Sequence, residues 1–256
     1  MKFFQKSYLI IVIFICLLGA GCIKTNTPPG TSALTIVNAI PNSNALVTNF
    51  WGNTGSQIAM SDTLQYYATA LQIYYANWSE LSSYSGKTSL SLPQISDTTT
   101  SLTNLTMNLQ IGSIYSLFIT GSDTAHVDTL FTKDIIPYYP YSGDSVIGVR
   151  FINLSTGSLP VQVTLQSDTT HTPIANNISY KTVTPFQELS SNVNALANGY
   201  TFEFRDAASD SVLTTVSFTT GSYPAMFPFK SVTICLIGQP GVSAAVPLSG
   251  MIYPNY

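Results

Sequence analysis

Short apolar alternations, separated by turn residues, run through this chain from Ala33 to its end. Apolar and polar residues alternate from Val161 to Leu165, from Tyr200 to Phe204 and from Val212 to Phe218. A period of two carried by β-branched and aromatic residues is typical of strands that bury one face. No long window shows a comparable helical period. The pattern therefore predicts an all-β protein.

Charge is scarce in this sequence. Charged residues make up 8% of the chain and the formal net charge is −3, so hydroxyl and amide groups must solvate most of the surface. Binding to nucleic acid needs clustered Lys and Arg. The composition therefore excludes nucleic acid as a partner.

The N-terminal residues have the three parts of a secretory signal peptide. Lys2 and Lys6 precede an apolar run from Tyr8 to Leu18, and the small residues at 19–21 follow. The run is shorter than the roughly 20 residues that a membrane-spanning helix needs. Because Cys22 comes directly after the small residues, the segment resembles a bacterial lipobox, although its leucine lies one position earlier than usual. The resemblance implies that residues 1–21 are removed and that Cys22 carries lipid.

Residues 22–32 are predicted to be a flexible tether, because they are polar and contain Pro28, Pro29 and Gly30. The lipid would make the membrane a partner and place the protein in the cell envelope, at the outer membrane. The tether lacks an acidic cluster near Cys22, so the periplasmic and the surface face both stay open. Cys235 has no partner cysteine for an intramolecular disulfide, and its apolar neighbours predict a small buried hydrophobe.

Three sequence features recur in the same order and at nearly the same spacing. The run Ile36–Asn38 matches Phe151–Asn153, Tyr66 matches Tyr180, and two strands close on Gly121 and Gly238. We interpret this as two tandem immunoglobulin-like β-sandwich domains, because a repeat of roughly 100 residues has the usual size of that fold. The predicted domains are residues 33–136 and 146–256, and the Pro- and Tyr-rich residues 137–145 are the predicted linker.

These repeats resemble a known family. The segments Ile36–Pro41 and Arg150–Ser155, with the strands that end at Gly121 and Gly238, are similar to the "domain of unknown function 4397" lipoproteins of bacteroidete envelopes. The first repeat has Leu34-Thr35 where the family often has an arginine before the turn. The resemblance implies a fold and an envelope location, and it implies no reaction.

Candidate catalytic groups are few. His126 and His171 both lie in polar, loop-like segments, and neither stands in an established metal-ligand or nucleophile motif. None of Glu80, Glu188 and Glu203 is paired in the sequence with an aspartate as a glycosidase requires. We therefore predict no catalytic residue, no metal and no cofactor.

Aromatic residues are the candidates for ligand contact. Exposed rings stack on sugars or anchor protein partners, whereas alternation alone would bury half of them in sandwich cores. The rings predicted to contact a ligand are Trp51, Trp78, Tyr138, Tyr139 and Tyr141.

Seven of the aspartates begin an Asp-Ser/Thr pair that is followed by a small aliphatic residue or Thr. The pattern resembles the acceptor motif of bacteroidete O-glycosylation, and the alternative is that Asp-Ser/Thr makes Asx-turns at strand ends. The hydroxyls that would carry glycan are Thr63, Thr98, Thr124, Thr129, Ser145, Thr169 and Ser211.

The sequence as a whole indicates a membrane-anchored envelope lipoprotein that acts as a non-catalytic binding or structural module. Its expected partners are a glycan or an envelope protein. Two alternatives stay open: a carbohydrate-active hydrolase whose carboxylates come together only in the fold, and an accessory subunit of an envelope complex.

Overall fold

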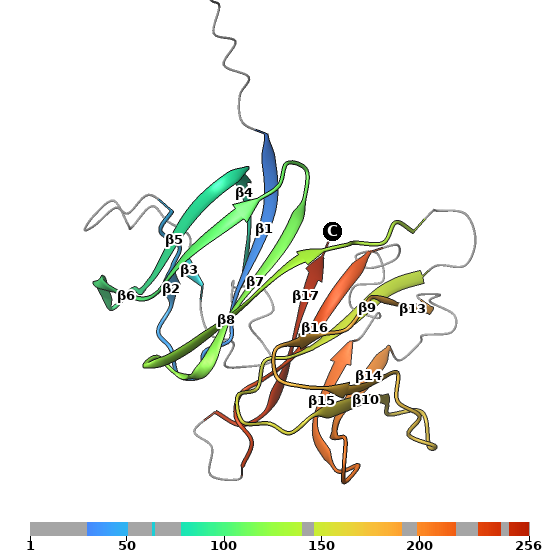
Figure 1. The fold of residues 1–256 in the computed structure, drawn as a ribbon. Helices are drawn as coiled ribbons and strands as arrows, with labels where there is room; N and C mark the ends of the chain where they lie inside the picture. The colour runs from blue at the N-terminus through green and yellow to red at the C-terminus, as the bar shows by residue number, and fades with distance from the viewer. Residues whose placement is uncertain are drawn as a thin grey trace, which may run out of the picture. The chain divides into compact units, whose positions relative to one another are not determined.

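The computed structural model describes residues 30–50, 63–64, 78–139, 146–190, 199–218, 230–241 and 246–255, without the side chains of 63–64 and 78–80. The chain divides into residues 1–30 and a compact unit of residues 31–256, and the description below concerns the second. Every regular element in the described ranges is a strand (Figure 1), which confirms the predicted all-β fold. The described residues contain no helix of the length and apolarity that crossing a bilayer requires.

The first half of this unit, strands β1 to β8, forms two sheets. Sheet A has the order β4-β1-β7-β8, and sheet B has the order β3-β2-β5-β6. In sheet A, β1 is parallel to β7 and antiparallel to β4. The strands are β1 Thr31–Asn38, β2 Leu46–Val47, β3 Thr63–Leu64, β4 Trp78–Tyr84, β5 Gly86–Gln94, β6 Asp97–Leu109, β7 Ile114–Asp123 and β8 His126–Asp134.

The second half, strands β9 to β17, also forms two sheets. Sheet C has the order β12-β9-β16-β17, with β13 also paired to β9, and sheet D has the order β11-β10-β14-β15. As in sheet A, the two central strands, β9 and β16, are parallel. The strands are β9 Val146–Asn153, β10 Val161–Leu165, β11 Ala175–Ile178, β12 Thr182–Val183, β13 Gln187–Ser190, β14 Tyr200–Asp206, β15 Val212–Phe218, β16 Ser231–Ile237 and β17 Ser249–Asn255.

Among the described residues, three hydrophobic cores hold these sheets together. One lies between sheets A and B and contains Ile36, and another lies between sheets C and D and contains Phe151. Their sequence neighbours Val37 and Ile152 point the opposite way, because successive side chains of a strand alternate. They belong to the third core, which joins sheet A to sheet C. Sheets A and C are thus covered by apolar contacts on both faces, which explains the nearly continuous apolar sequences of their central strands.

The two halves repeat one turn in detail. Asn38 and Asn153 each accept a hydrogen bond from the backbone N–H two residues later, at 3.1 and 3.0 Å. Each also donates through Nδ2 to the hydroxyl five residues later, Ser43 at 3.0 Å and Ser158 at 2.9 Å. An Asx-turn therefore ends the first strand of each half, at the asparagines that the sequence comparison paired.

The paired glycines are equally alike. Gly121 and Gly238 both have a positive φ, of 141° and 86°. A Cβ at either position would collide with a backbone carbonyl, that of His126 or that of Pro247. Tyr66, the third paired residue, lies outside the described residues. The immunoglobulin-like character of the two halves and their predicted boundaries stay predictions.

Candidate functional site

A buried ion pair joins the two halves. Arg150 of β9 binds Asp134 of β8 through two parallel hydrogen bonds, Nη1 to Oδ1 at 2.8 Å and Nη2 to Oδ2 at 2.9 Å. The two side chains are 5% and 1% exposed. Arg150 Nε also donates to Thr233 Oγ1 at 2.7 Å, and Ser116 Oγ donates to Asp134 Oδ2 at 2.5 Å. The charges are thus removed from water but compensated by hydrogen bonds, as a buried pair requires.

This polar cluster is built from equivalent positions of the two halves. The hydrogen bond from Ser116 to Asp134 across β7 and β8 recurs as the bond from Thr233 to Asn255 across β16 and β17. On the neighbouring strand of sheet C, Arg150 lies opposite Thr233. The same position of sheet A holds an uncharged threonine opposite Ser116. Each half therefore contributes one charge of opposite sign to a joint that is otherwise repeated.

Burial by itself lowers the pKa of Arg150, but its interactions with Tyr253 and Asp134 outweigh burial and leave the pKa raised. The guanidinium is therefore charged at every relevant pH. Its counterion is already present in Asp134, so this arginine is not available to bind a substrate anion.

Contacts farther along the same strands fix the other end of the joint. Thr120 Oγ1 donates to the carbonyl of Leu154 at 2.7 Å. Lys181 Nζ donates to Asp128 Oδ1 at 2.7 Å, and these two side chains are 30% and 44% exposed. The pKa of Asp128 is lowered, because its hydrogen bonds and the charge of Lys181 outweigh desolvation. The halves are thus joined by a buried ion pair, an apolar core and an exposed ion pair.

An open hollow of about 480 Å³ lies beside the buried pair. The ring of Phe186 covers the Arg150 guanidinium, with 4.7 Å between Cζ and the ring centroid, a cation–π contact. The ionisable groups of the lining are Lys133, Asp134 and Arg150, and the last two are paired with each other. Lys133 Nζ donates to Gln110 at 2.7 Å. The lining therefore offers shape and apolar surface to a ligand, and it offers no free acid–base pair. The lining residues are Thr132, Lys133, Asp134, Ile135, Pro137, Arg150, Val183, Thr184, Pro185 and Phe186.

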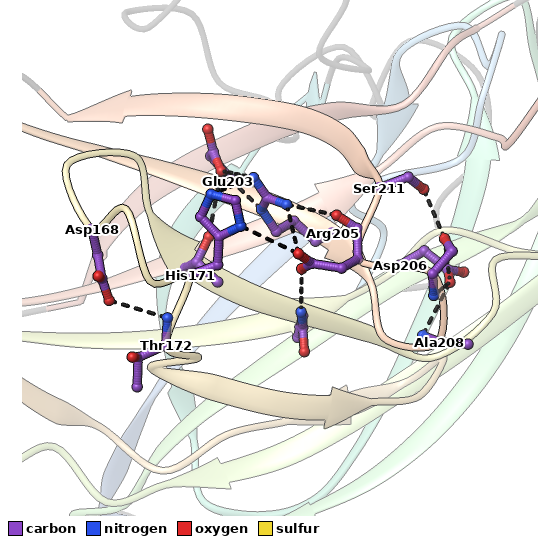
Figure 2. Close-up of polar contacts among 12 residues, drawn as sticks. Asp168, His171, Thr172, Glu203, Arg205, Asp206, Ala208 and Ser211 are labelled. Atoms are coloured by element: carbon purple, nitrogen blue, oxygen red, sulfur yellow. Dashed lines mark hydrogen bonds and ion pairs between the residues drawn. The ribbon is translucent and has the colours of Figure 1, made fainter.

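A second charged cluster lies at one end of sheet D (Figure 2). Arg205 of β14 lies between two carboxylates, 2.8 Å from Glu203 and 3.2 Å from Asp210. His171 Nδ1 lies 3.2 Å from Asp210 Oδ2, and its Nε2 lies 3.4 Å from Arg205 Nη2. Because a guanidinium only donates, Nε2 is the acceptor in this contact, and Nδ1 faces the Asp210 carboxylate. Both ring nitrogens are thus engaged.

The fold therefore brings Glu203 and Asp210 together, as the hydrolase alternative requires, but an arginine lies between them. The pKa of Asp210 is lowered, chiefly by its hydrogen bond from His171 and further by the charge of Arg205. A glycosidase acid must hold a proton near neutral pH and needs a raised pKa. The geometry of this pair is that of an ion-pair network around Arg205.

Sequence reasoning did not predict either arginine of the chain, Arg150 or Arg205, as a site residue. The available signal was their rarity and their place inside alternating apolar strands, where an unpaired charge would be costly. Their partners lie on other strands, so the sequence could not show which carboxylate each one meets. The sequence predicts His171 to lie in a loop, and the structure places it there. Its positive φ of 52° and that of Asp210, 58°, become visible only in the structure.

The Asp-Ser/Thr pairs make Asx-turns at several predicted glycosylation sites. Asp97 and Asp168 accept the backbone N–H two residues later at 3.0 and 2.9 Å, and Asp123 does so at 2.8 Å. Hydrogen bonds lower the pKa of all three carboxyls, and the largest effect comes from the side chain of Thr99 on Asp97, of Thr170 on Asp168 and of His126 on Asp123.

Asx-turns thus explain why aspartates stand at these three positions. They neither require nor forbid a glycan on the neighbouring hydroxyls. Thr169 and Ser211 are exposed, whereas Thr98, Thr124 and Thr129 are half-buried. The side chain of Thr63 and all of Ser145 lie outside what the structure describes.

The aromatic candidates divide into one exposed ring, one buried ring and three that are not described. Tyr138 is 84% exposed, whereas Tyr139 is 5% exposed and lies against Gly148 of β9. Burial raises the pKa of the Tyr139 hydroxyl. Trp51, Tyr141 and the side chain of Trp78 lie outside the described residues, as does Cys22. Within the described chain, Tyr138 is the candidate that solvent reaches.

The described residues contain no group of three or more His, Cys, Asp or Glu side chains that could hold a metal ion. Neither the family models nor the curated proteins with which the chain was compared match it.

Proposed function

We propose that this protein is a lipid-anchored, non-catalytic module of the bacterial cell envelope, attached to the outer membrane through Cys22. The observation that carries the proposal is the use made of the buried charges. Arg150 and Asp134 are committed to joining the two halves, and Arg205 is committed to its two neighbouring carboxylates. A protein whose buried ionic groups are paired with one another holds its strands in fixed positions and is suited to presenting a rigid surface.

The partner we propose is a glycan or an envelope protein. The hollow beside Phe186 and the exposed ring of Tyr138 support this assignment, because an apolar, partly aromatic surface suits sugar rings and peptide side chains alike. The family resemblance favours the same class of protein. Glycan on the exposed Asp-Ser/Thr hydroxyls is part of the proposal.

Mass spectrometry of the native protein from a membrane fraction tests the anchor. The expected N-terminus is Cys22 with acyl groups, and any excess mass beyond lipid reports glycan. A Cys22→Ala variant should leave the membrane fraction or keep its leader. A mature protein with an unmodified Cys22 would contradict the proposal.

Affinity capture of the lipidated protein tests the binding role. The expected result is a partner that is lost with Tyr138→Ser and retained with Leu159→Ser, a variant of another exposed apolar residue, which is 67% exposed. Equal capture by both variants would exclude the surface around Tyr138.

A further inference from the structure

Exposed apolar side chains gather where the chain enters the first half. Thr31, the first residue of β1, pairs with Tyr84, which is 61% exposed. The carbonyl of Thr31 also accepts a hydrogen bond at 2.9 Å from Gly112, whose neighbour Ile111 is 72% exposed. The strand register thus places both large apolar residues beside the entry point.

Ile135 belongs to the same end of the sandwich. It directly follows Asp134, which pairs with Ile114 at the start of β7, and it is 85% exposed. The turn that carries Ile111 leads into the same strand. We call Tyr84, Ile111 and Ile135 the entry rim.

The two ends of the first half carry side chains of opposite charge. Two exposed lysines lie at the entry end: Lys87 at the start of β5, and Lys133, which reaches Gln110. The carboxylate at this end of β8, Asp134, is neutralised by Arg150. At the opposite end of the sandwich lie Asp97, Asp123 and Asp128. The described part of the entry end therefore combines large apolar side chains with uncompensated positive charge.

The length of the tether limits how far the entry rim can lie from the membrane. Thr31 is the ninth residue after Cys22 in the sequence. At about 3.3–3.6 Å per residue, a fully extended chain of this length spans roughly 30 Å. A lipid on Cys22 thus keeps the entry end within that distance of the bilayer at all times. Tyrosines and lysines with apolar stems are the side chains that favour the lipid–water boundary.

We propose that the entry rim rests on the lipid surface, with Tyr84, Ile111 and Ile135 in the headgroup region and Lys87 and Lys133 at anionic lipids. This inference depends on the lipid anchor proposed above. Lys133 and Ile135 also line the hollow beside Phe186, so a ligand of that hollow is bound close to the membrane.

Three of the other large apolar residues exposed to solvent lie away from the entry end of the first half. Ile95 lies in the turn between β5 and β6, at the opposite end of the first half, and is 56% exposed. Leu159 and Val212 lie in the second half. Isolated exposed residues of this kind are common. Ile95 therefore provides the matched control.

Nitroxide labelling of the full lipidated protein tests the inference. Ile111→Cys and Ile95→Cys variants are labelled and reconstituted in vesicles of phosphatidylethanolamine and phosphatidylglycerol. Cys235 is buried and does not compete for the label. The ratio of collisions with oxygen to collisions with a water-soluble nickel chelate is expected to be several-fold higher at the Ile111 site. Exchange of phosphatidylglycerol for phosphatidylcholine should lower that ratio, and Lys87→Gln with Lys133→Gln should abolish the lipid dependence.

Equal collision ratios at the two sites, with an acylated Cys22 confirmed by mass, would overturn the rim and leave the anchor intact. An unmodified Cys22, which would itself take up label, would overturn the anchor and this inference together. A rim covered by a protein partner would appear as high chelate access in pure vesicles, which also overturns the inference.

Discussion

The buried pair between the two halves makes the sharpest prediction. Asp134→Ala removes the two carboxylate oxygens that accept hydrogen bonds from Nη1 and Nη2 of Arg150, and with them the acceptor of Ser116 Oγ. The arginine is then left almost fully buried without a counterion. Breaking a buried pair in this way costs about 3–5 kcal/mol.

The exposed pair between the same two halves is the matched control. Asp128→Ala removes the contact with Lys181, in which both side chains are partly solvated. Such pairs contribute about 0–1 kcal/mol and are screened by salt. The two variants thus separate burial from the mere presence of an ion pair at the joint.

Thermal unfolding followed by circular dichroism measures both costs. For a unit of this size, 1 kcal/mol corresponds to about 2–4 °C in melting temperature, so Asp134→Ala should melt about 6–20 °C lower than the native protein. Asp128→Ala should fall by less than about 4 °C. Added salt should shrink the effect of the Asp128 change and leave the effect of the Asp134 change in place.

A double variant tests the physical reason. Arg150→Met combined with Asp134→Leu removes both charges, and an apolar replacement of a buried pair is often neutral or stabilising. The double variant should therefore be more stable than Asp134→Ala. If Asp134→Ala and Asp128→Ala cost the same, or if the double variant is the least stable of the three, the reasoning is wrong.

Three other predictions concern separate features. Gly121→Ala should cost about 1–2 kcal/mol of stability for its positive φ and about 1–3 kcal/mol more for the collision of the new Cβ with the opposite strand, as measured by urea unfolding. Gly86→Ala also has a positive φ but open space around it, so it should show only the cost of the positive φ. No thiol of the native protein should react with Ellman's reagent, because burial raises the pKa of the Cys235 thiol and Cys22 is acylated. Unfolding should expose one reactive thiol, that of Cys235, and two reactive thiols would contradict the lipid anchor. Because the pKa of Asp168 is lowered in the folded state, the ionised carboxylate stabilises the fold above about pH 4, and this contribution is lost as the pH falls further. Asp168→Asn should therefore lose less stability than the native protein between pH 5 and 3. The same dependence of stability on pH in both proteins would refute this.

Local chemistry accounts for what could be predicted about the fold. The alternation from Tyr200 to Phe204 predicts β14, because side-chain direction in a strand depends only on position along it. The turns at Asn38 and Asn153 are closed by residues within five positions, so the sequence comparison could pair them. These features carry their partners with them.

The candidate site lies beyond that reach. The Arg150 bond to Thr233 spans 83 residues and its bond to Asp134 joins two different halves, so no local pattern specifies either contact. Tyr138 and Tyr139 are chemically identical neighbours, yet one is exposed and the other is buried against Gly148.

Neighbouring residues are enough to predict that this protein is built of strands and where its repeated turns fall, because those features depend on short stretches of chain. Alternation assigns each strand two faces without saying what covers them. The folded chain is needed to show that sheets A and C cover each other and that the two arginines pair with carboxylates. It is also needed to show that exposed apolar side chains gather at the entry rim. Packing between distant strands sets those outcomes, because burial and charge pairing are properties of the assembled chain.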